Sequence, residues 1–180
     1  GRIFYTQDKG KTWSSTSLEP QRTINSISFR DSLNGIAGSA QNQFGGAAFG
    51  QFYSTSDGGL TWQLLPPFPF PYYASTVQYV PGSENSYVAT SGGFDYAAFI
   101  THDGGYTWEI LDDVHSFGAI AFQSPTLGWI GRGHSGGANT ATLYKWDGEP
   151  FPAAQPDQAD LELYGSVDAI EYSIYQNYTF

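Results

Sequence analysis

The sequence predicts an all-β fold, and three features support this: an aromatic-rich composition, frequent turn residues and a repeated hairpin motif. Aromatic residues make up 17% of the 180 residues, whereas charged residues make up only 13%. Aromatic side chains suit the pleated, half-buried surface of a sheet. The 22 glycines and 10 prolines divide the chain into short segments, which is typical of all-β domains.

The repeated motif reads Thr-x-Asp-x-Gly-x-Thr-Trp and occurs three times. Its fixed residues are Thr6, Asp8, Gly10, Thr12 and Trp13 in the first copy, Thr55, Asp57, Gly59, Thr61 and Trp62 in the second, and Thr101, Asp103, Gly105, Thr107 and Trp108 in the third. Successive copies are 49 and 46 residues apart. A period of this length fits one four-stranded blade of a β-propeller.

The chemistry of the motif predicts a structural role for these fifteen residues. An aspartate can accept hydrogen bonds from backbone N–H groups within a tight hairpin. The glycine permits a positive φ, and the tryptophan can bury a large surface between neighbouring blades. None of these roles requires a substrate.

The motif resembles the Asp box, or BNR repeat, of sialidases, sortilin-type receptors, xyloglucan hydrolases and photosystem II assembly-factor propellers. The resemblance covers residues 1 to about 148. It implies that each box joins the third and fourth strands of a blade and lies at the rim, away from the ligand-binding face.

This placement of the boxes predicts a partial ring of four-stranded antiparallel blades over residues 1–148, with two whole and two partial blades. The first blade contributes only its third and fourth strands, and the last contributes three strands and a decayed box at residues 143–148. The expected positions are 2–6 and 12–15 for the first blade, 23–66 and 74–112 for the whole blades, and 117–122, 127–132 and 141–146 for the last.

The remaining residues have a different character. Residues 149–159 read as a Pro-rich linker, and residues 160–180 as a C-terminal β-strand segment that either closes the last blade or contacts a partner. Closed propellers have four to eight blades. The sequence, which has no initiator Met, is therefore expected to be a fragment or processed product, with the ring completed by a longer chain or by other copies.

The charge limits the choice of partner. The chain has seven Lys and Arg residues and a net charge of −10. It has no basic stripe to neutralise phosphates, so a nucleic-acid partner is not expected. An anionic membrane surface would repel it, and no apolar run reaches the roughly 20 residues that a membrane span needs.

Binding is expected on the loops opposite the boxes, because loops on a rigid scaffold commonly carry function. The candidates are Gln41, Asn42, Phe44, Phe94, Asp95, Tyr96, Asp112, His115, Arg132 and His134. Aromatic rings beside amides and carboxylates suit a glycan or a peptide. In the alternative interpretation these loops are connectors, and the aromatic residues of the loop at 66–73 pack into the core.

Catalytic chemistry finds little support in the sequence. A sialidase-like site needs three clustered arginines, but the chain has four in all and only Arg132 lies on a candidate loop. A xyloglucan-hydrolase-like site needs two carboxylates across a cleft, and nothing fixes the separation of Asp95 from Asp112 or Asp113. The three histidines lack ligand spacing, so neither a metal nor a cofactor is expected.

The sequence thus predicts a non-enzymatic recognition or structural module that binds a glycan or a protein. It is expected to be secreted or on the cell surface, and to come from a bacterium. The alternative function is a portion of a secreted glycoside hydrolase, sialidase-like or xyloglucanase-like.

Overall fold

The computed structural model describes residues 1–41, 49–72, 74–91, 97–113, 117–132, 140–146 and 167–173, and these form fourteen strands. The strands make four antiparallel sheets, which we call blades 1 to 4. Blade 1 contains β1 (Arg2–Tyr5) and β2 (Ser14–Ser17). Blade 2 contains β3 (Thr23–Phe29), β4 (Gly35–Gln41), β5 (Phe49–Thr55) and β6 (Gln63–Leu64).

Blades 3 and 4 repeat the order of blade 2. Blade 3 contains β7 (Ala74–Tyr79), β8 (Tyr87–Ser91), β9 (Ala98–Thr101) and β10 (Glu109–Asp112). Blade 4 contains β11 (Phe117–Ser124), β12 (Leu127–Arg132), β13 (Thr140–Trp146) and β14 (Val167–Ser173). Each four-stranded sheet pairs its strands in chain order, as a propeller blade does.

The predicted all-β, bladed architecture is confirmed, with two differences in detail. Strand β14 pairs with β13 from Trp146↔Val167 to Thr140↔Ser173, so blade 4 has four strands and the chain holds three four-stranded sheets. The strand expected at 12–15 begins at Ser14, because the backbone N–H of Thr12 donates to the Asp8 carboxylate within the turn. The linker at 149–159 lies outside the described residues.

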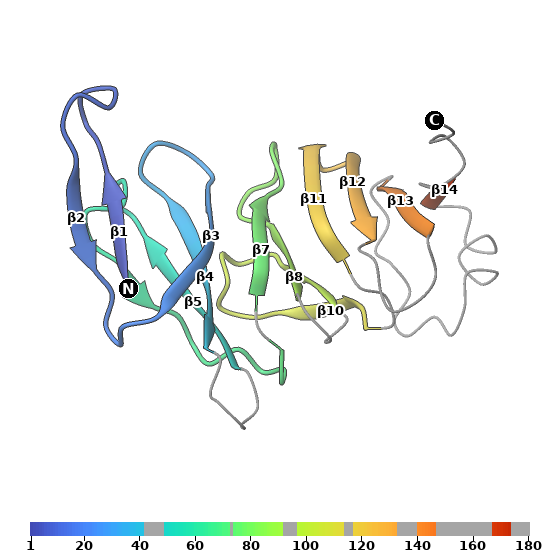
Figure 1. Cartoon of the computed structure of the whole chain (residues 1–180), viewed down its shortest axis with the longest axis horizontal. Helices are drawn as coiled ribbons and strands as arrows, with labels where there is room; N and C mark the ends of the chain where they lie inside the picture. Colours follow the sequence, from blue (N-terminus) through green and yellow to red (C-terminus); the bar gives the residue numbers. More distant parts are fainter. Residues whose placement is uncertain are drawn as a thin grey trace, which may run out of the picture.

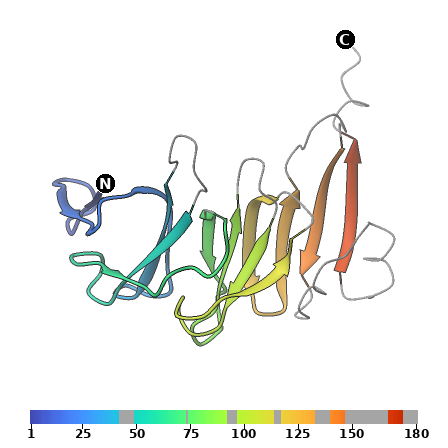
Figure 2. The ribbon, with the colours of Figure 1, turned by 90° about the horizontal axis from the view of Figure 1, so that it is seen from below.

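The four blades follow one another in chain order along the molecule (Figures 1 and 2). The core is divided into three clusters, one in each seam between consecutive blades. Alternation along the strands supplies both faces of a blade: on β5, Phe52 faces blade 3 and Tyr53 faces blade 1. The middle seam, between blades 2 and 3, is the most aromatic, and Phe68 and Phe70 of the inter-blade loop pack there.

The turn of each box places two successive residues in the left-handed region. The second of the two is always the box glycine, whereas the first is Gly58 or Gly104 in the later boxes and Lys9 in the first, with φ of 60°. A side chain with a Cβ pays a steric penalty in this region that glycine does not.

Replacing Lys9 by glycine is therefore expected to raise the free energy of unfolding. The increase should not exceed about 1 kcal/mol, because glycine also has more conformational freedom in the unfolded chain, which offsets part of the stabilisation. Urea unfolding measures the change. Lys9→Ala is the matched control, since it removes the same charged side chain and keeps the Cβ. Equal stabilisation by both variants would show that the backbone conformation is not the cause.

Candidate functional site

Each Asp box is closed by its own hydrogen bonds. In the second box, Asp57 Oδ1 accepts from the Thr55 hydroxyl at 2.8 Å and from the Thr61 backbone N–H at 2.9 Å, while Oδ2 accepts from the Thr61 hydroxyl at 2.5 Å. The Gly59 N–H donates to the Thr55 hydroxyl oxygen at 3.0 Å. The same four bonds recur in the other two boxes, at 2.6 to 2.9 Å.

These bonds favour the ionised form of the box carboxylates. Hydrogen bonds from Thr12 hold the pKa of Asp8 at about 2, and those from Thr61 hold that of Asp57 at about 2. Burial acts to raise the pKa of Asp103, but the hydrogen bonds from Thr107 outweigh it and the pKa is lowered. Each carboxylate is thus engaged within its own turn.

The box tryptophan seals the seam toward the preceding blade. The ring N–H of Trp108 donates to the Gly105 carbonyl at 3.1 Å, and the ring stacks on Phe52 of blade 2 with centroids 4.4 Å apart. Trp62 makes the same bond to Gly59 and packs on the cluster between blades 1 and 2. Trp13, in blade 1, is 61% exposed.

Blade 4 fills its seam with a tryptophan from another position. Trp146 pairs with Gly128 as Thr55 pairs with Gly35, so it stands where a regular box has its first threonine. Its ring N–H donates to the Pro125 carbonyl at 2.8 Å, and the ring is buried against Phe122. The decayed box therefore still supplies an aromatic ring to the seam between blades 3 and 4.

Most of the predicted binding residues lie outside the described residues: Asn42, Phe44, Phe94, Asp95, Tyr96, His115 and His134. Gln41 and Arg132 are the last residues of β4 and β12. Asp112, expected in an inter-blade loop, is instead the last residue of β10 and only 2% exposed. Its carboxylate is therefore not presented to solvent.

A different surface is well defined, namely the end of the sheets that carries the boxes. The turns between the first and second strands, residues 30–34 and 80–86, lie at this end too. The N–H of Gly58 donates to the Leu33 carbonyl at 2.9 Å and that of Gly104 to the Asn85 carbonyl at 3.0 Å. We call this surface, the two turns together with the boxes, the box edge.

One arginine bridges blades 2 and 3 on the box edge. A terminal nitrogen of the Arg30 guanidinium donates to the Glu84 carbonyl at 3.2 Å and to Asn85 Oδ1 at 3.0 Å. Its Nε lies 3.2 Å from Asp31, whose pKa is lowered chiefly by the Leu33 backbone N–H. The positive charge of Arg30 is therefore offset locally.

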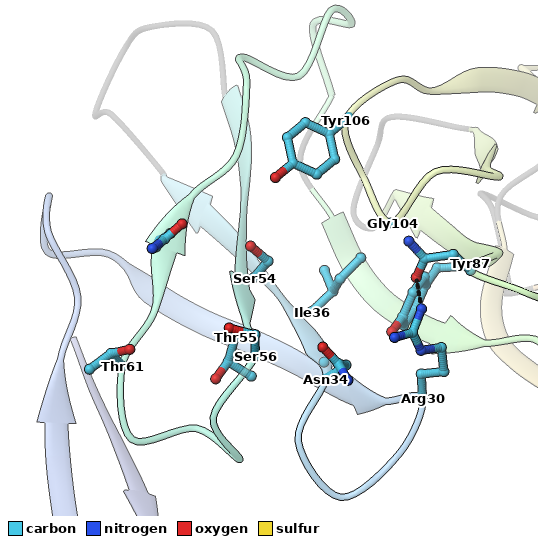
Figure 3. A pocket seen from close by; sticks show the side chains of 13 residues that line it. Arg30, Asn34, Ile36, Ser54, Thr55, Ser56, Thr61, Tyr87, Gly104 and Tyr106 are labelled. Atoms are coloured by element: carbon cyan, nitrogen blue, oxygen red, sulfur yellow. Dashed lines mark hydrogen bonds between the residues drawn. The ribbon is translucent and has the colours of Figure 1, made fainter.

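A polar crevice of about 210 Å³ opens on the box edge between blades 2 and 3 (Figure 3). Hydroxyl and amide groups line it, with Tyr106, 61% exposed, at one side. Burial raises the pKa of Tyr87, which also lines the crevice, to about 12, so its phenol stays protonated. The polar side chains that line the crevice include Arg30, Ser54, Ser56, Gln63, Asn85 and Tyr87.

The next seam, between blades 3 and 4, holds an apolar pocket of about 260 Å³ on the same edge. The register explains the contrast, because Ile100 pairs with Val88 as Ser54 pairs with Ile36. A serine facing the polar crevice is thus replaced by an isoleucine facing the apolar pocket. The apolar lining consists of Val80, Val88, Ile100, Phe122, Pro125 and Trp146, and the polar lining of Ser83, Ser86 and His102.

Sequence reasoning placed binding on the opposite face and did not find these two cavities. The available signal was the comparison of equivalent positions in successive repeats, where polar residues in one seam give way to apolar ones in the next. Among the described residues, no group of three or more His, Cys, Asp or Glu side chains could hold a metal ion. No helix in the described part of the chain is long and apolar enough to cross a membrane.

The comparisons with known proteins agree with the blade architecture. The family model described as BNR/Asp-box repeat matches residues 99–109, the third box. No curated protein matches the sequence. The chain is similar to the solved structure titled "YCF48 bound to D1 peptide", with a TM-score of 0.57 and 22% identity, covering 84% of this chain. It spans 46% of the YCF48 chain. The chain thus contains Asp-box (BNR) repeats and has the blade architecture of the β-propeller fold.

Proposed function

We propose that this chain is a non-enzymatic recognition module that binds a segment of another protein at the polar crevice of the box edge. The observation that carries the proposal is one crevice lined by the exposed ring of Tyr106, by hydroxyl and amide groups and by the paired guanidinium of Arg30 (Figure 3). An aromatic surface beside fixed hydrogen-bonding groups is typical of peptide-binding sites. The similar YCF48 structure, whose title names a bound peptide, supports this choice.

The lining favours binding over hydrolysis. A glycosidase needs two carboxylates across its cleft. Neither cavity has a carboxylate among its described lining residues. Hydroxyls, amides and a paired guanidinium orient a ligand by hydrogen bonds and do not supply the carboxylic acid and carboxylate that a glycosidase uses.

Selection from a random 12-residue peptide library displayed on phage tests the function. We expect enriched peptides to bind the chain and to lose at least tenfold in affinity with Tyr106→Ala. Trp13→Ala removes an equally exposed ring from blade 1 and should leave binding unchanged. Enrichment of no peptide, or equal binding to both variants, would contradict the proposed site.

A glycan is the second candidate ligand, because the exposed ring of Tyr106 could also stack on the apolar face of a sugar. A glycan array with the same two variants distinguishes the candidates. Sugar binding that depends on Tyr106, without peptide binding, would replace the protein partner by a glycan. Turnover of a sialoside or of xyloglucan would favour the alternative of a glycoside hydrolase portion.

We further propose that the chain acts outside the cytoplasm and that additional blades complete its ring. The exposed side chains of Phe4 and Trp13 on blade 1 support the additional blades, because both give such a blade an apolar surface on which to pack. Cell fractionation tests the location. Mass measurement in solution distinguishes a self-assembling chain from a 19.6 kDa monomer that needs blades from a longer protein.

A further inference from the structure

We infer that the partner is an extended, non-acidic peptide that occupies both cavities of the box edge at once. An apolar side chain enters the apolar pocket, and a hydroxyl or amide side chain about three residues away enters the polar crevice. This inference rests on the proposed function and specifies its ligand.

The two cavities share one wall, which is the edge of blade 3. Tyr87 lines the polar crevice, and the next residue, Val88, lines the apolar pocket. Residues of the third box also line both cavities, because Tyr106 lines the polar crevice and His102 lines the apolar pocket. A ligand that crosses this single blade edge therefore reaches both cavities.

The spacing of the two anchors follows from the thickness of one blade. Packed sheets lie about 10 Å apart. A peptide extended in the polyproline II conformation advances about 3.1 Å per residue with three residues per turn, so side chains three positions apart lie on the same face, about 9 Å from each other. Crossing from one seam to the next thus takes about three residues. A shorter spacing leaves one cavity unfilled, and a longer one forces the peptide to bulge over blade 3.

The apolar pocket is large enough for an aromatic ring or a branched aliphatic side chain. Its volume is about 260 Å³, and a cavity of about 150 Å³ can accommodate benzene. The pocket also has a polar side, because the Ser86 hydroxyl and His102 Nδ1 lie 3.0 Å apart. These groups can hydrogen-bond the peptide backbone while the side chain is buried.

The charge of the box edge disfavours an acidic partner. The carboxylates of Asp57 and Asp103 have lowered pKa values and remain ionised at neutral pH, and the charge of Arg30 is offset by Asp31. The whole chain carries a net charge of −10. Complementary charge speeds association and like charge suppresses it, so the preferred peptide is neutral or basic.

Synthetic nonapeptides test the spacing directly. Each carries one Phe and one Gln, separated by one to six positions in a Gly/Ser background with a terminal Lys. Affinity measured by fluorescence anisotropy is expected to peak at a separation of three and to fall at least tenfold at one and at six. Replacing the Lys by Glu in the best peptide should weaken binding, and the weakening should shrink at high salt.

Paired variants of Ser86 test the use of the apolar pocket. Ser86→Phe places a ring over the pocket and should weaken the best peptide at least tenfold, whereas Ser86→Ala leaves the pocket open, loses only the hydrogen bond of the hydroxyl and should weaken it by about threefold or less. A peptide without the Phe should not respond to Ser86→Phe. Thermal unfolding of each variant confirms that the blades stay folded.

The outcomes separate this inference from the proposed function. Loss of binding with Tyr106→Ala but not with Ser86→Phe would overturn the two-cavity ligand and keep the binding module. A flat dependence on spacing would also overturn it. Indifference of peptide binding to both variants would overturn the proposed site as well.

Discussion

Replacing Trp108 by alanine is expected to lower the free energy of unfolding by about 3–5 kcal/mol, the usual cost of deleting a buried large aromatic side chain. The ring is only 7% exposed, and it contacts Phe52 face to face and Phe68 edge to face. Its loss leaves a cavity in the seam between blades 2 and 3 and removes the N–H that satisfies the Gly105 carbonyl. Urea unfolding followed by far-UV circular dichroism measures the change.

Trp13→Ala is the matched control, because it removes the same residue from the same position of the first box. Its ring is 61% exposed in the single chain, so the change should stay within about 0.5 kcal/mol when the variant is measured as a monomer. Similar losses for the two variants would show that the tryptophan acts within its turn and not through the seam.

Replacing Asp103 by alanine is expected to cost about 1–3 kcal/mol, because the Thr107 N–H and hydroxyl and the Thr101 hydroxyl lose their acceptor. Asp103→Asn keeps one oxygen acceptor and the shape of the side chain, and should cost less. Binding of an uncharged peptide by a folded Asp103→Asn variant should be unchanged, because the hydrogen-bonding groups of the carboxylate are engaged within the box. A loss of binding without a loss of stability would assign Asp103 to the ligand site.

The box carboxylates also predict how stability depends on pH. Their pKa values are lower in the folded chain than the ordinary value of 3.8, at about 2 for Asp8 and Asp57. The folded state therefore binds fewer protons than the unfolded state, and the stabilisation is complete above about pH 5 and lost toward pH 2. Acidification also relieves repulsion within a chain of net charge −10, which acts in the opposite direction.

Urea unfolding at several pH values between 2 and 6 separates these two effects. Asp103→Asn removes one of the three box carboxylates, so its stability should fall less steeply with acid than that of the wild type. Parallel pH profiles would show that Asp103 does not contribute to the acid sensitivity.

The blades were predictable from the sequence because the repeat encodes them locally. The box fixes its own turn through Thr and Asp, and the alternating runs on either side fix the strands. The pairing of β14 with β13 could not be predicted from the sequence. The alternation of apolar and polar residues from Val167 onward predicts a strand but does not indicate which neighbouring strand it pairs with. The role of Trp146 was hidden for a related reason: its motif is degraded, and only the register shows that it fills a seam.

The cavities were harder to predict than the blades, because they depend on two blades at once. Ser54 and Ile100 look like ordinary alternating strand residues, and their significance arises only when the register places them in equivalent seams. The prediction that ligands bind on the face opposite the boxes came from the resemblance to other propellers. That resemblance does not indicate cavities at the box edge. Aligning the repeats by strand register would have revealed the polar and apolar positions.

The contact of the box tryptophan with the preceding blade affects how the number of blades can change in proteins of this kind. Because Trp62 and Trp108 each close onto the blade before them, a blade carries within its own sequence the means to join its predecessor. Duplicating one blade therefore adds a unit that docks without redesign of its neighbour. Deleting blade 2 would bring Trp108 to the side of blade 1 that Trp62 now contacts, so gene rearrangement can alter the number of blades in whole steps.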